Sequence, residues 1–283
     1  GAALAAHPAI DGLLFTGGSK LGERFRKSFA NKPEKMLALE LGGNNPLVVW
    51  DSPDLDAAVS LILQSAYVTA VQRCTCARRL ILPDNDFARE LVARIEKAID
   101  ELRVGSAHQT PEVFMGPVIG AADAAQLLAQ QAELAAKGAK ILRPLRSLKE
   151  NTGIVSPALL DVTGIDDLPD EERFGPLLQL RRVDTFEDAI QEANNTRFGL
   201  AAGLVSASPE RYQQFRTRVK AGIINWNKPL TGASGAAPFG GIGLSGNHRP
   251  SGFFAADYCS YAVGSLESPN LESGALPPGL RPA

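Results

Sequence analysis

Residues 10–29 read IDGLLFTGGSKLGERFRKSF and contain a strand, a glycine turn and a helix in succession. The apolar run 10–16 predicts a short strand, the small residues 17–19 predict a turn, and apolar residues recur at helical spacing over 20–29. A second short strand is predicted at 36–39. In α/β folds this order brings backbone N–H groups at a helix start close to a nucleotide. The segment is not a G-x-G-x-x-G motif, however, and a plain strand-to-helix turn remains open.

The same alternation of strands and helices continues along the chain. It predicts helices at 54–70, 87–102, 121–137, 186–194 after an N-cap at Thr185, and 209–220, and strands at 79–82, 140–142, 199–205 and 222–226. Strands that alternate with helices are typical of a parallel sheet. The fold class expected is therefore α/β. The tail from residue 268 is rich in Pro, Gly, Ser and Glu and is expected to be irregular.

The composition narrows the classes of partner. Acidic residues number 31 against 29 basic ones, and no Lys/Arg-rich run is present, so neither nucleic acid nor an anionic membrane is an expected partner. Three cysteines make an odd number in a long chain, which argues against a disulfide framework and for a reducing compartment. The chain shows no leader pattern and no apolar segment long enough to span a membrane. These features predict a cytoplasmic protein that acts on a small molecule.

Four stretches concentrate residues that could carry chemistry: LELGGNNP at 39–46, QRCTC at 72–76, DEERFGP at 170–176 and PFGGIGLSG at 238–246. In the first, Glu40 follows an apolar strand and precedes two glycines. Its carboxylate could cap a turn or pair with a lysine. The glycines favour an alternative, since they let the backbone approach a ligand closely.

In the second stretch, Cys74 has three interpretations. Cys74 and Cys76 could be buried structural thiols, or half of a metal site. A metal site is not expected, because the chain has no second Cys or His pair to complete it. Cys74 could also be a nucleophile, if adjacent Arg73 and the N–H groups of a following turn stabilise its thiolate.

The four stretches, in this order, resemble the aldehyde dehydrogenase superfamily, as does Phe15-Thr16-Gly17 leading to Gly22. The segments 194–200 and 225–229 fit the same frame, and the resemblance covers nearly the whole chain. Within the superfamily, the segments 72–79, 225–231 and 246–251 resemble the enzymes that oxidise N-succinylglutamate 5-semialdehyde in bacterial arginine degradation.

The resemblance implies NAD-dependent oxidation of an aldehyde. Cys74 is then the nucleophile that forms a thioester, and Glu40 is the base that activates water to hydrolyse it. Glu172 is expected to hold the nicotinamide ribose and Phe174 to flank the nicotinamide ring. The residues expected along the cofactor's phosphates are Gly17, Gly18, Ser19, Lys20, Leu21 and Gly22.

The same resemblance implies the chain's organisation. Residues 1–42 are expected to be the end of a Rossmann-like NAD-binding domain, 43–246 a parallel-sheet catalytic domain, and 247–283 a segment that returns toward the first domain. A strand at 260–263 is expected to join the sheet of a neighbouring subunit, which predicts a homo-oligomer. A substrate with several carboxylates calls for cationic groups, for which His248 and Arg249 are the candidates. A solvated turn is the equally open interpretation of these two residues.

The sequence also departs from the family's pattern. Val71 stands where glycine is usual, Gly18 where serine is usual, and Arg173 where an apolar residue is usual. If the backbone at Val71 needs a positive φ, a β-branched residue is strained there. The family's first half, with an asparagine that supports the oxyanion, is expected to be absent, and 1–39 is expected to expose apolar residues.

Two alternatives from other classes remain open. The first is a non-catalytic fragment or assembly module that keeps the fold without the reaction. The second is a cysteine hydrolase that pairs Cys74 with a histidine and needs no cofactor. The hydrolase leaves the segments 171–176 and 238–246 without a role.

Overall fold

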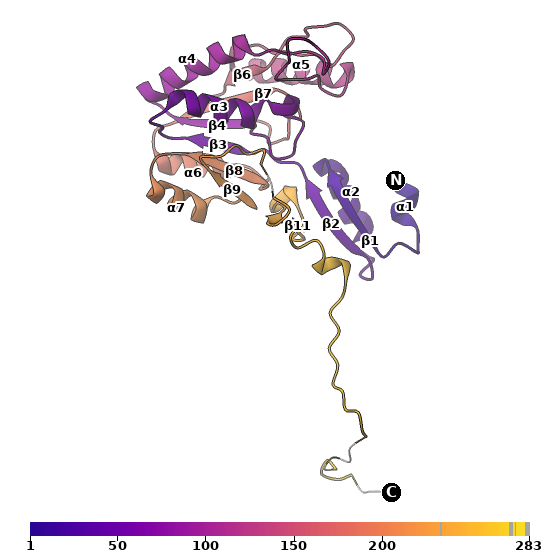
Figure 1. Ribbon diagram of the computed structural model, residues 1–283. Helices are drawn as coiled ribbons and strands as arrows, with labels where there is room; N and C mark the ends of the chain where they lie inside the picture. Colours follow the sequence, from indigo (N-terminus) through magenta and orange to yellow (C-terminus); the bar gives the residue numbers. More distant parts are fainter. Residues whose placement is uncertain (233, 272–273, 275, 281–283) are drawn as a thin grey trace.

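The computed structural model describes residues 1–232, 234–271, 274 and 276–280 and has an α/β architecture with one large sheet and two small two-stranded sheets (Figure 1). The larger sheet has seven strands, and every neighbouring pair is parallel except β5–β6. Their order across the sheet is β5 (Lys140–Arg143), β6 (Ala158–Asp161), β7 (Leu177–Val183), β4 (Arg79–Pro83), β3 (Pro46–Val49), β8 (Ala201–Val205) and β9 (Ile223–Trp226). The expectation of a mainly parallel sheet is confirmed.

Helices cover both faces of this sheet (Figure 1). One face carries α3 (Leu55–Ala66), α4 (Asp86–Glu101) and α5 (Ala121–Ala136), and the other carries α6 (Phe186–Asn194) and α7 (Pro209–Arg218). Leu47 and Val49 lie in the core under α3 and α4, whereas Val48, between them in the sequence, packs in the core under α6 and α7. Successive side chains of a strand point to opposite faces. The neighbouring strands β3 and β8 are accordingly apolar on both faces.

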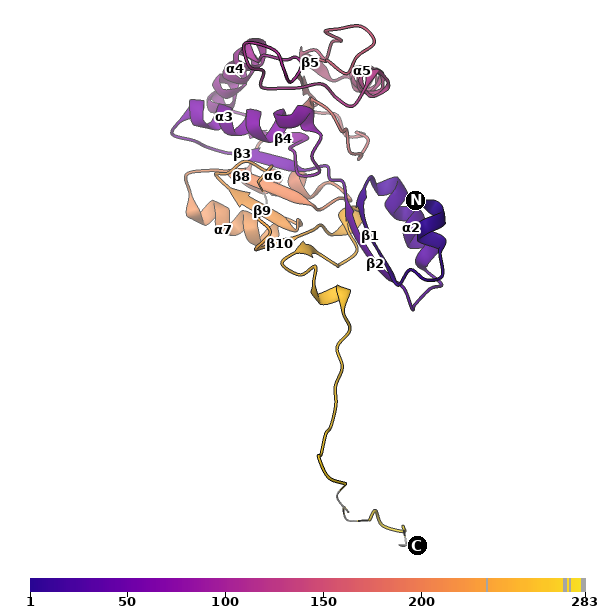
Figure 2. The same ribbon diagram turned by 45° about the vertical axis from the view of Figure 1, so that its right-hand side comes forward.

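The smaller sheet pairs β1 (Gly12–Gly17) with β2 (Met36–Leu41) in parallel, and α2 (Ser19–Phe29) connects them (Figure 2). The short helix α1 (Ala2–Ala6) precedes it. Phe15 and Phe25 meet edge to face at 4.9 Å between ring centroids and fix α2 on the sheet. Leu4, Leu14 and Leu21 are 62%, 55% and 43% exposed. The expectation that 1–39 exposes apolar side chains is confirmed.

Most predicted elements are present within a few residues of their expected bounds. Thr185 begins α6 with a capping box, in which its hydroxyl accepts from the backbone of Asp188 and the Asp188 carboxylate accepts from the backbone of Thr185. The helix expected over 54–70 is wrong at its end. It stops at Ala66, and the 3₁₀ turn η1 (Val68–Val71) follows with left-handed residues. Strands β3, β6 and β7 were not predicted from the sequence: β3 and β6 have only four residues each, and β7 follows an irregular loop.

The last part of the chain returns to the smaller sheet. The antiparallel pair β10 (Pro238–Phe239) and β11 (Ser251–Gly252), with η2 (Gly243–Ser245) between them, lies beside β2, and η3 (Asp257–Cys259) follows. Beyond η3 the chain extends away from the body (Figure 2). The segment 260–263 pairs with no strand of the described residues, and Tyr261 is 88% exposed. Its pairing with a neighbouring subunit stays a prediction. No helix among the described residues is long and apolar enough to cross a membrane.

Candidate active site

The four stretches singled out in the sequence meet where the two sheets adjoin. Asn45, just before β3, donates from Nδ2 to the carbonyls of Cys74 at 2.7 Å and Cys76 at 2.9 Å, which joins the first stretch to the second. Asn45 is 1% exposed and its Oδ1 accepts from Ala201 N at 3.1 Å. A buried amide with all these bonds has one orientation. The Cys74 loop is therefore fixed to the sheet.

Two further hydrogen bonds connect the third and fourth stretches to the first. The Asp170 carboxylate accepts from Asn44 Nδ2 at 3.0 Å, which ties the loop before β7 to the chain before β3. The fully buried Ser245 donates from Oγ to Gly42 O at 2.7 Å and accepts from Gly199 N at 3.0 Å. Segments more than 100 residues apart thus form one connected site.

Cys74 lies half-buried in the loop between η1 and β4. Burial raises the pKa of its thiol, and the cation of Arg78 opposes that rise, while the carboxylates of Glu172 and Glu40 add to it. The prediction that adjacent Arg73 supplies the cation is wrong. Arg73 is exposed, whereas Arg78, four residues after Cys74, is buried, and its Nη1 lies 3.5 Å from Cys74 O.

The backbone that leads into Cys74 is left-handed at three consecutive residues. Thr69 and Ala70 both have φ 53° and Val71 has φ 61°. The condition under which a β-branched residue would be strained at this position, a positive φ, is therefore met. L-residues with a side chain cost roughly 1–2 kcal/mol there, and a β-branched residue is the least suited. Val71 is nevertheless 1% exposed, so its packing in the core offsets the strain.

Glu40 sits near the end of β2 and has a raised pKa. One carboxylate oxygen, Oε1, accepts from Ser251 N at 3.2 Å, and the other, Oε2, is buried without a hydrogen-bond partner among the described residues. Burial raises the pKa of Glu40 to about 7, against which the hydrogen bond with Ser251 acts. A carboxyl group with a free oxygen and a pKa near neutrality can take a proton from water.

Asn247 holds the strand that carries Glu40. Its Oδ1 accepts from Leu39 N at 2.9 Å and its Nδ2 donates to Leu37 O at 2.8 Å, so the side chain replaces a neighbouring strand at the edge of β2. Gly246 forms a bridge with Glu40 itself. This role of Asn247 was not predicted, because nothing in the sequence around it indicates a partner more than 200 residues away.

Glu172 and Phe174, from the loop before β7, both lie against Arg78. Glu172 Oε1 accepts from Arg78 Nη2 at 2.8 Å and from Gly43 N at 3.3 Å, and burial raises its pKa although Arg78 opposes the rise. A Cβ added at Gly42 would lie 1.8 Å from Glu172 Oε2, so glycine is required for this approach. Phe174 is 41% exposed, and the guanidinium of Arg78 lies 5.5 Å from its ring centroid.

The turn 17–22 forms the opening of α2, the eleven-residue helix after β1. Gly18 is its N-cap, with no cap from a side chain of the described residues and no atom of them within 4 Å of a Cβ added there. A Cβ at Gly22 would meet Leu41 at 2.5 Å, so that glycine lets α2 pack on β2. The open helix start offers unpaired N–H groups and a positive dipole end. These residues fit the phosphate of a nucleotide cofactor.

A comparison with family models matches residues 1–262 to the aldehyde dehydrogenase family. The chain belongs to the aldehyde dehydrogenase family. Among curated relatives, it is 53% identical over 282 residues to an N-succinylglutamate 5-semialdehyde dehydrogenase of Ectopseudomonas mendocina, and 52% identical over 281 residues to one of Hahella chejuensis. The alignments cover 100% and 99% of this chain but 57% of either relative. The chain thus spans little more than half the length of these curated relatives.

Solved structures agree on the fold. Betaine aldehyde dehydrogenase of Staphylococcus aureus, solved with NAD⁺, matches with a TM-score of 0.82 and 27% identity over 90% of this chain and 52% of that one. An NADP-dependent enzyme of E. coli matches with a TM-score of 0.79 and 32% identity over 89% and 52% of the two chains. The aldehyde dehydrogenase-like α/β fold expected from the sequence is confirmed.

His248 and Arg249 line a pocket to which no residue of the Cys74 loop contributes. This pocket, of about 680 Å³ between β1–β2 and η3, also contains three carboxylates, Asp11, Glu34 and Asp257. Burial is the main cause that raises the pKa of the Tyr258 hydroxyl. The charge of Glu40 adds to that rise and the charge of Arg249 opposes it. The carboxylates weaken the case for an anion here. The assignment of His248 and Arg249 to substrate binding stays a prediction.

Arg173, singled out in the sequence because an apolar residue is usual at this position, is buried. Its side chain is 0% exposed, and Glu171 Oε1 at 3.1 Å and Glu133 Oε2 at 3.8 Å form ion pairs with Nη2. None of its guanidinium nitrogens has a well-aligned hydrogen bond among the described residues. Burial accordingly lowers the pKa of Arg173.

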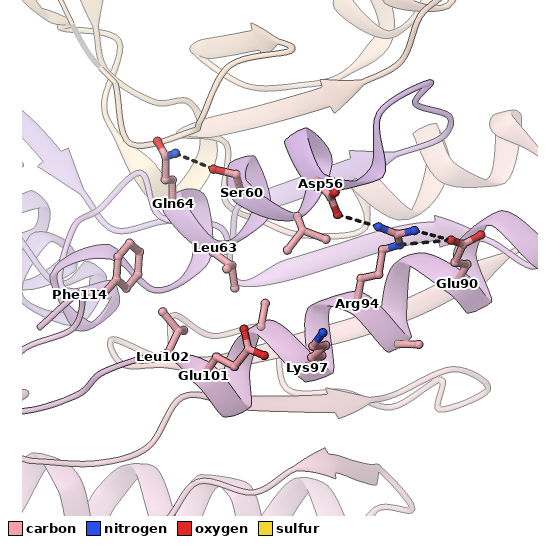
Figure 3. Close-up of a pocket in the computed structure, with 13 residues that line it drawn as sticks. Asp56, Ser60, Leu63, Gln64, Glu90, Arg94, Lys97, Glu101, Leu102 and Phe114 are labelled. Carbon is pink, nitrogen blue, oxygen red and sulfur yellow. Dashed lines mark hydrogen bonds and ion pairs between the residues drawn. The ribbon is translucent and has the colours of Figure 1, made fainter.

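A separate groove of about 840 Å³ runs between α3 and α4 (Figure 3). Its charged walls pair with one another: Arg94 donates to Asp56 at 2.7 Å and to Glu90 at 2.8 Å. None of its lining residues belongs to the four stretches, so it has no place in the site. Among the described residues, no cluster of His, Cys, Asp and Glu could hold a metal ion.

Proposed function

We propose that this chain carries the catalytic part of an NAD-dependent dehydrogenase that oxidises N-succinylglutamate 5-semialdehyde to N-succinylglutamate. The observation that carries the proposal is the placement of a half-buried thiol, Cys74, near a carboxyl group with a free oxygen, Glu40, inside the motif frame of the family. The substrate rests on the two curated relatives of that name.

The chemistry assigns one step to each residue. The Cys74 thiolate attacks the aldehyde carbon and forms a C–S bond, which leaves a thiohemiacetal. A bound nicotinamide would supply the hydride acceptor that this carbon needs for the thiohemiacetal to become a thioester. Glu40 then accepts a proton from water, the hydroxyl adds to the thioester carbon, and the Cys74 sulfur leaves as a thiolate. A positioned base contributes about 10²–10⁴-fold to such a step.

The residues proposed to hold NAD lie on two segments. The helix start at 17–22 would bind the phosphates, and Glu172 would accept hydrogen bonds from the ribose hydroxyls beside Phe174. Glu172 meets Arg78 and Gly43 N through Oε1. We propose NAD rather than NADP as the cofactor. Solved structures of similar fold include one complex with NAD⁺ and one with NADP.

Further parts of the proposal concern the whole protein. A homo-oligomer joined through 260–263 is supported by the exposed Tyr261 and Val263, and a cytoplasmic location by three cysteines that are all free. The domain boundary near residue 42 is supported by the change of sheet between Leu41, which ends β2, and Pro46, which begins β3.

The test is NADH formation by the purified chain with NAD and N-succinylglutamate 5-semialdehyde, with Cys74→Ala as the control. NADH that depends on Cys74 would support the dehydrogenase. Absence of NADH from folded protein would favour the second candidate, a non-catalytic fragment.

A further inference from the structure

Arg78 is a buried cation at the centre of the site to which the family's reaction assigns no role. It is 1% exposed, directly before β4. Its Nη1 donates to Cys76 O at 2.6 Å, and its Nη2 donates to Arg73 O at 3.0 Å and to Glu172 Oε1 at 2.8 Å. Phe174 covers the other side at 5.5 Å between Cζ and the ring centroid. One guanidinium thus contacts both the nucleophile loop and the loop before β7.

The contacts with the loop carbonyls do not by themselves require an arginine. The Asn45 side chain already donates to the carbonyls of Cys74 and Cys76, at 2.7 and 2.9 Å. Burying a charge is costly unless it is paired. What Arg78 adds beyond Asn45 is a positive charge below the thiol and a direct bond to Glu172.

We propose that Arg78 is a positioning residue that holds Glu172 against Gly42 and Gly43 and places a permanent cation beneath Cys74. Its planar fork can bond the Cys74 loop and the Glu172 carboxylate at once, which the ammonium of a lysine cannot do with the same geometry. The inference rests on the proposed role of Cys74 as the nucleophile.

Three charged groups face the Cys74 thiol, each from a different segment. Arg78 favours the thiolate, whereas Glu172, from the loop before β7, and Glu40, from β2, oppose it. Arg78 and Glu172 therefore have opposite effects on the thiol, although they are bonded to each other. A role limited to holding the fold together would give loss of either partner the same effect.

The experiment measures the alkylation rate of Cys74 by iodoacetamide at pH 7.5, resolved from Cys76 and Cys259 by mass spectrometry of peptides. It needs no turnover and no cofactor, so its outcome is separate from that of the NADH test. Arg78→Met should slow alkylation on the order of tenfold, since a neighbouring opposite charge shifts a pKa by a unit or more. Glu172→Gln should accelerate it. Arg78→Lys, which keeps the charge, should remain within about threefold of the parent rate.

The matched controls separate charge from damage to the fold. Circular dichroism reports whether each variant is folded, and Glu172→Gln with Arg78→Lys decides the question if Arg78→Met does not fold. Slower alkylation in both Arg78→Met and Glu172→Gln, or equal rates in Arg78→Met and the parent, would overturn the proposal.

Discussion

Glu40 accepts a hydrogen bond from the backbone N–H of Ser251 at 3.2 Å through Oε1, and its Oε2 is buried with no partner in the described part of the chain. This hydrogen bond fixes one of the two carboxylate oxygens in place. The Ser251 bond favours the carboxylate, yet burial outweighs it and raises the pKa of Glu40 to about 7. The carboxyl group is therefore divided between its two protonation states near neutral pH.

This pKa predicts how the water-activating step depends on pH. The base must be ionised, so thioester hydrolysis should increase through about pH 7 and level off above it. Single-turnover hydrolysis of the acylated enzyme, followed from pH 5.5 to 8.5, measures the midpoint. A hydrolysis rate that is constant over this range would contradict the assignment of Glu40 as the base.

The same pKa predicts an effect on stability. The folded chain holds the Glu40 proton more tightly than the unfolded chain, so stability present below about pH 4.5 is lost as the pH rises toward 7. Glu40→Gln removes this loss. At pH 8 the free energy of unfolding of the variant, measured with urea, should exceed that of the parent by about 1 kcal/mol after allowance for partial solvation. At pH 5 the two free energies of unfolding should be nearly equal. An equal difference at both pH values would sink this explanation.

The positive φ of Val71 predicts that glycine is more stable than alanine at this position, the reverse of the usual order. At an ordinary buried position, glycine is less stable than alanine by roughly 0.5–1 kcal/mol. At φ 61° the order should reverse, because glycine has no Cβ to strain. Val71→Gly should therefore be more stable than Val71→Ala by about 1 kcal/mol, measured by urea unfolding. Both should fall below the parent, whose side chain is buried.

The side chain of Asn247 is expected to stabilise the fold through both its hydrogen-bond donor and its acceptor. Asn247→Ala leaves Leu39 N and Leu37 O at the edge of β2 without their side-chain partner, and should cost about 1–3 kcal/mol. Asn247→Asp keeps the acceptor for Leu39 N but cannot donate to Leu37 O, so it should not restore the parent stability. Thermal unfolding of the two variants distinguishes them. Parent stability in Asn247→Ala would show that water replaces the side chain.

Sequence reasoning succeeded where residue type and local spacing determine the outcome. The capping box at Thr185 and the apolar period of the helices depend on neighbours within one turn, and the motifs around Glu40 and Cys74 do meet. Reasoning failed where burial decides. Arg73 and Arg78 are equally cationic in the sequence, and only the structure shows that Arg78 is the buried one, whose charge lowers the pKa of the Cys74 thiol.

Length also limited the sequence analysis. The four residues of β3 and of β6 are fully apolar or nearly so, and such short runs carry no period that separates strand from helix. The left-handed turn at 69–71 was missed for a related reason, since Thr69, Ala70 and Val71 are not residues that favour it.

The most direct test of the account is to trap the thioester. Glu40→Gln, incubated with NAD and N-succinylglutamate 5-semialdehyde, is analysed by mass spectrometry for an acyl group on the Cys74 peptide. The account predicts that the acyl-enzyme accumulates in Glu40→Gln, is short-lived in the parent, and is absent from Cys74→Ala. Folded Glu40→Gln that gains no acyl group on Cys74 would contradict the assignment of these two residues to successive steps of one reaction.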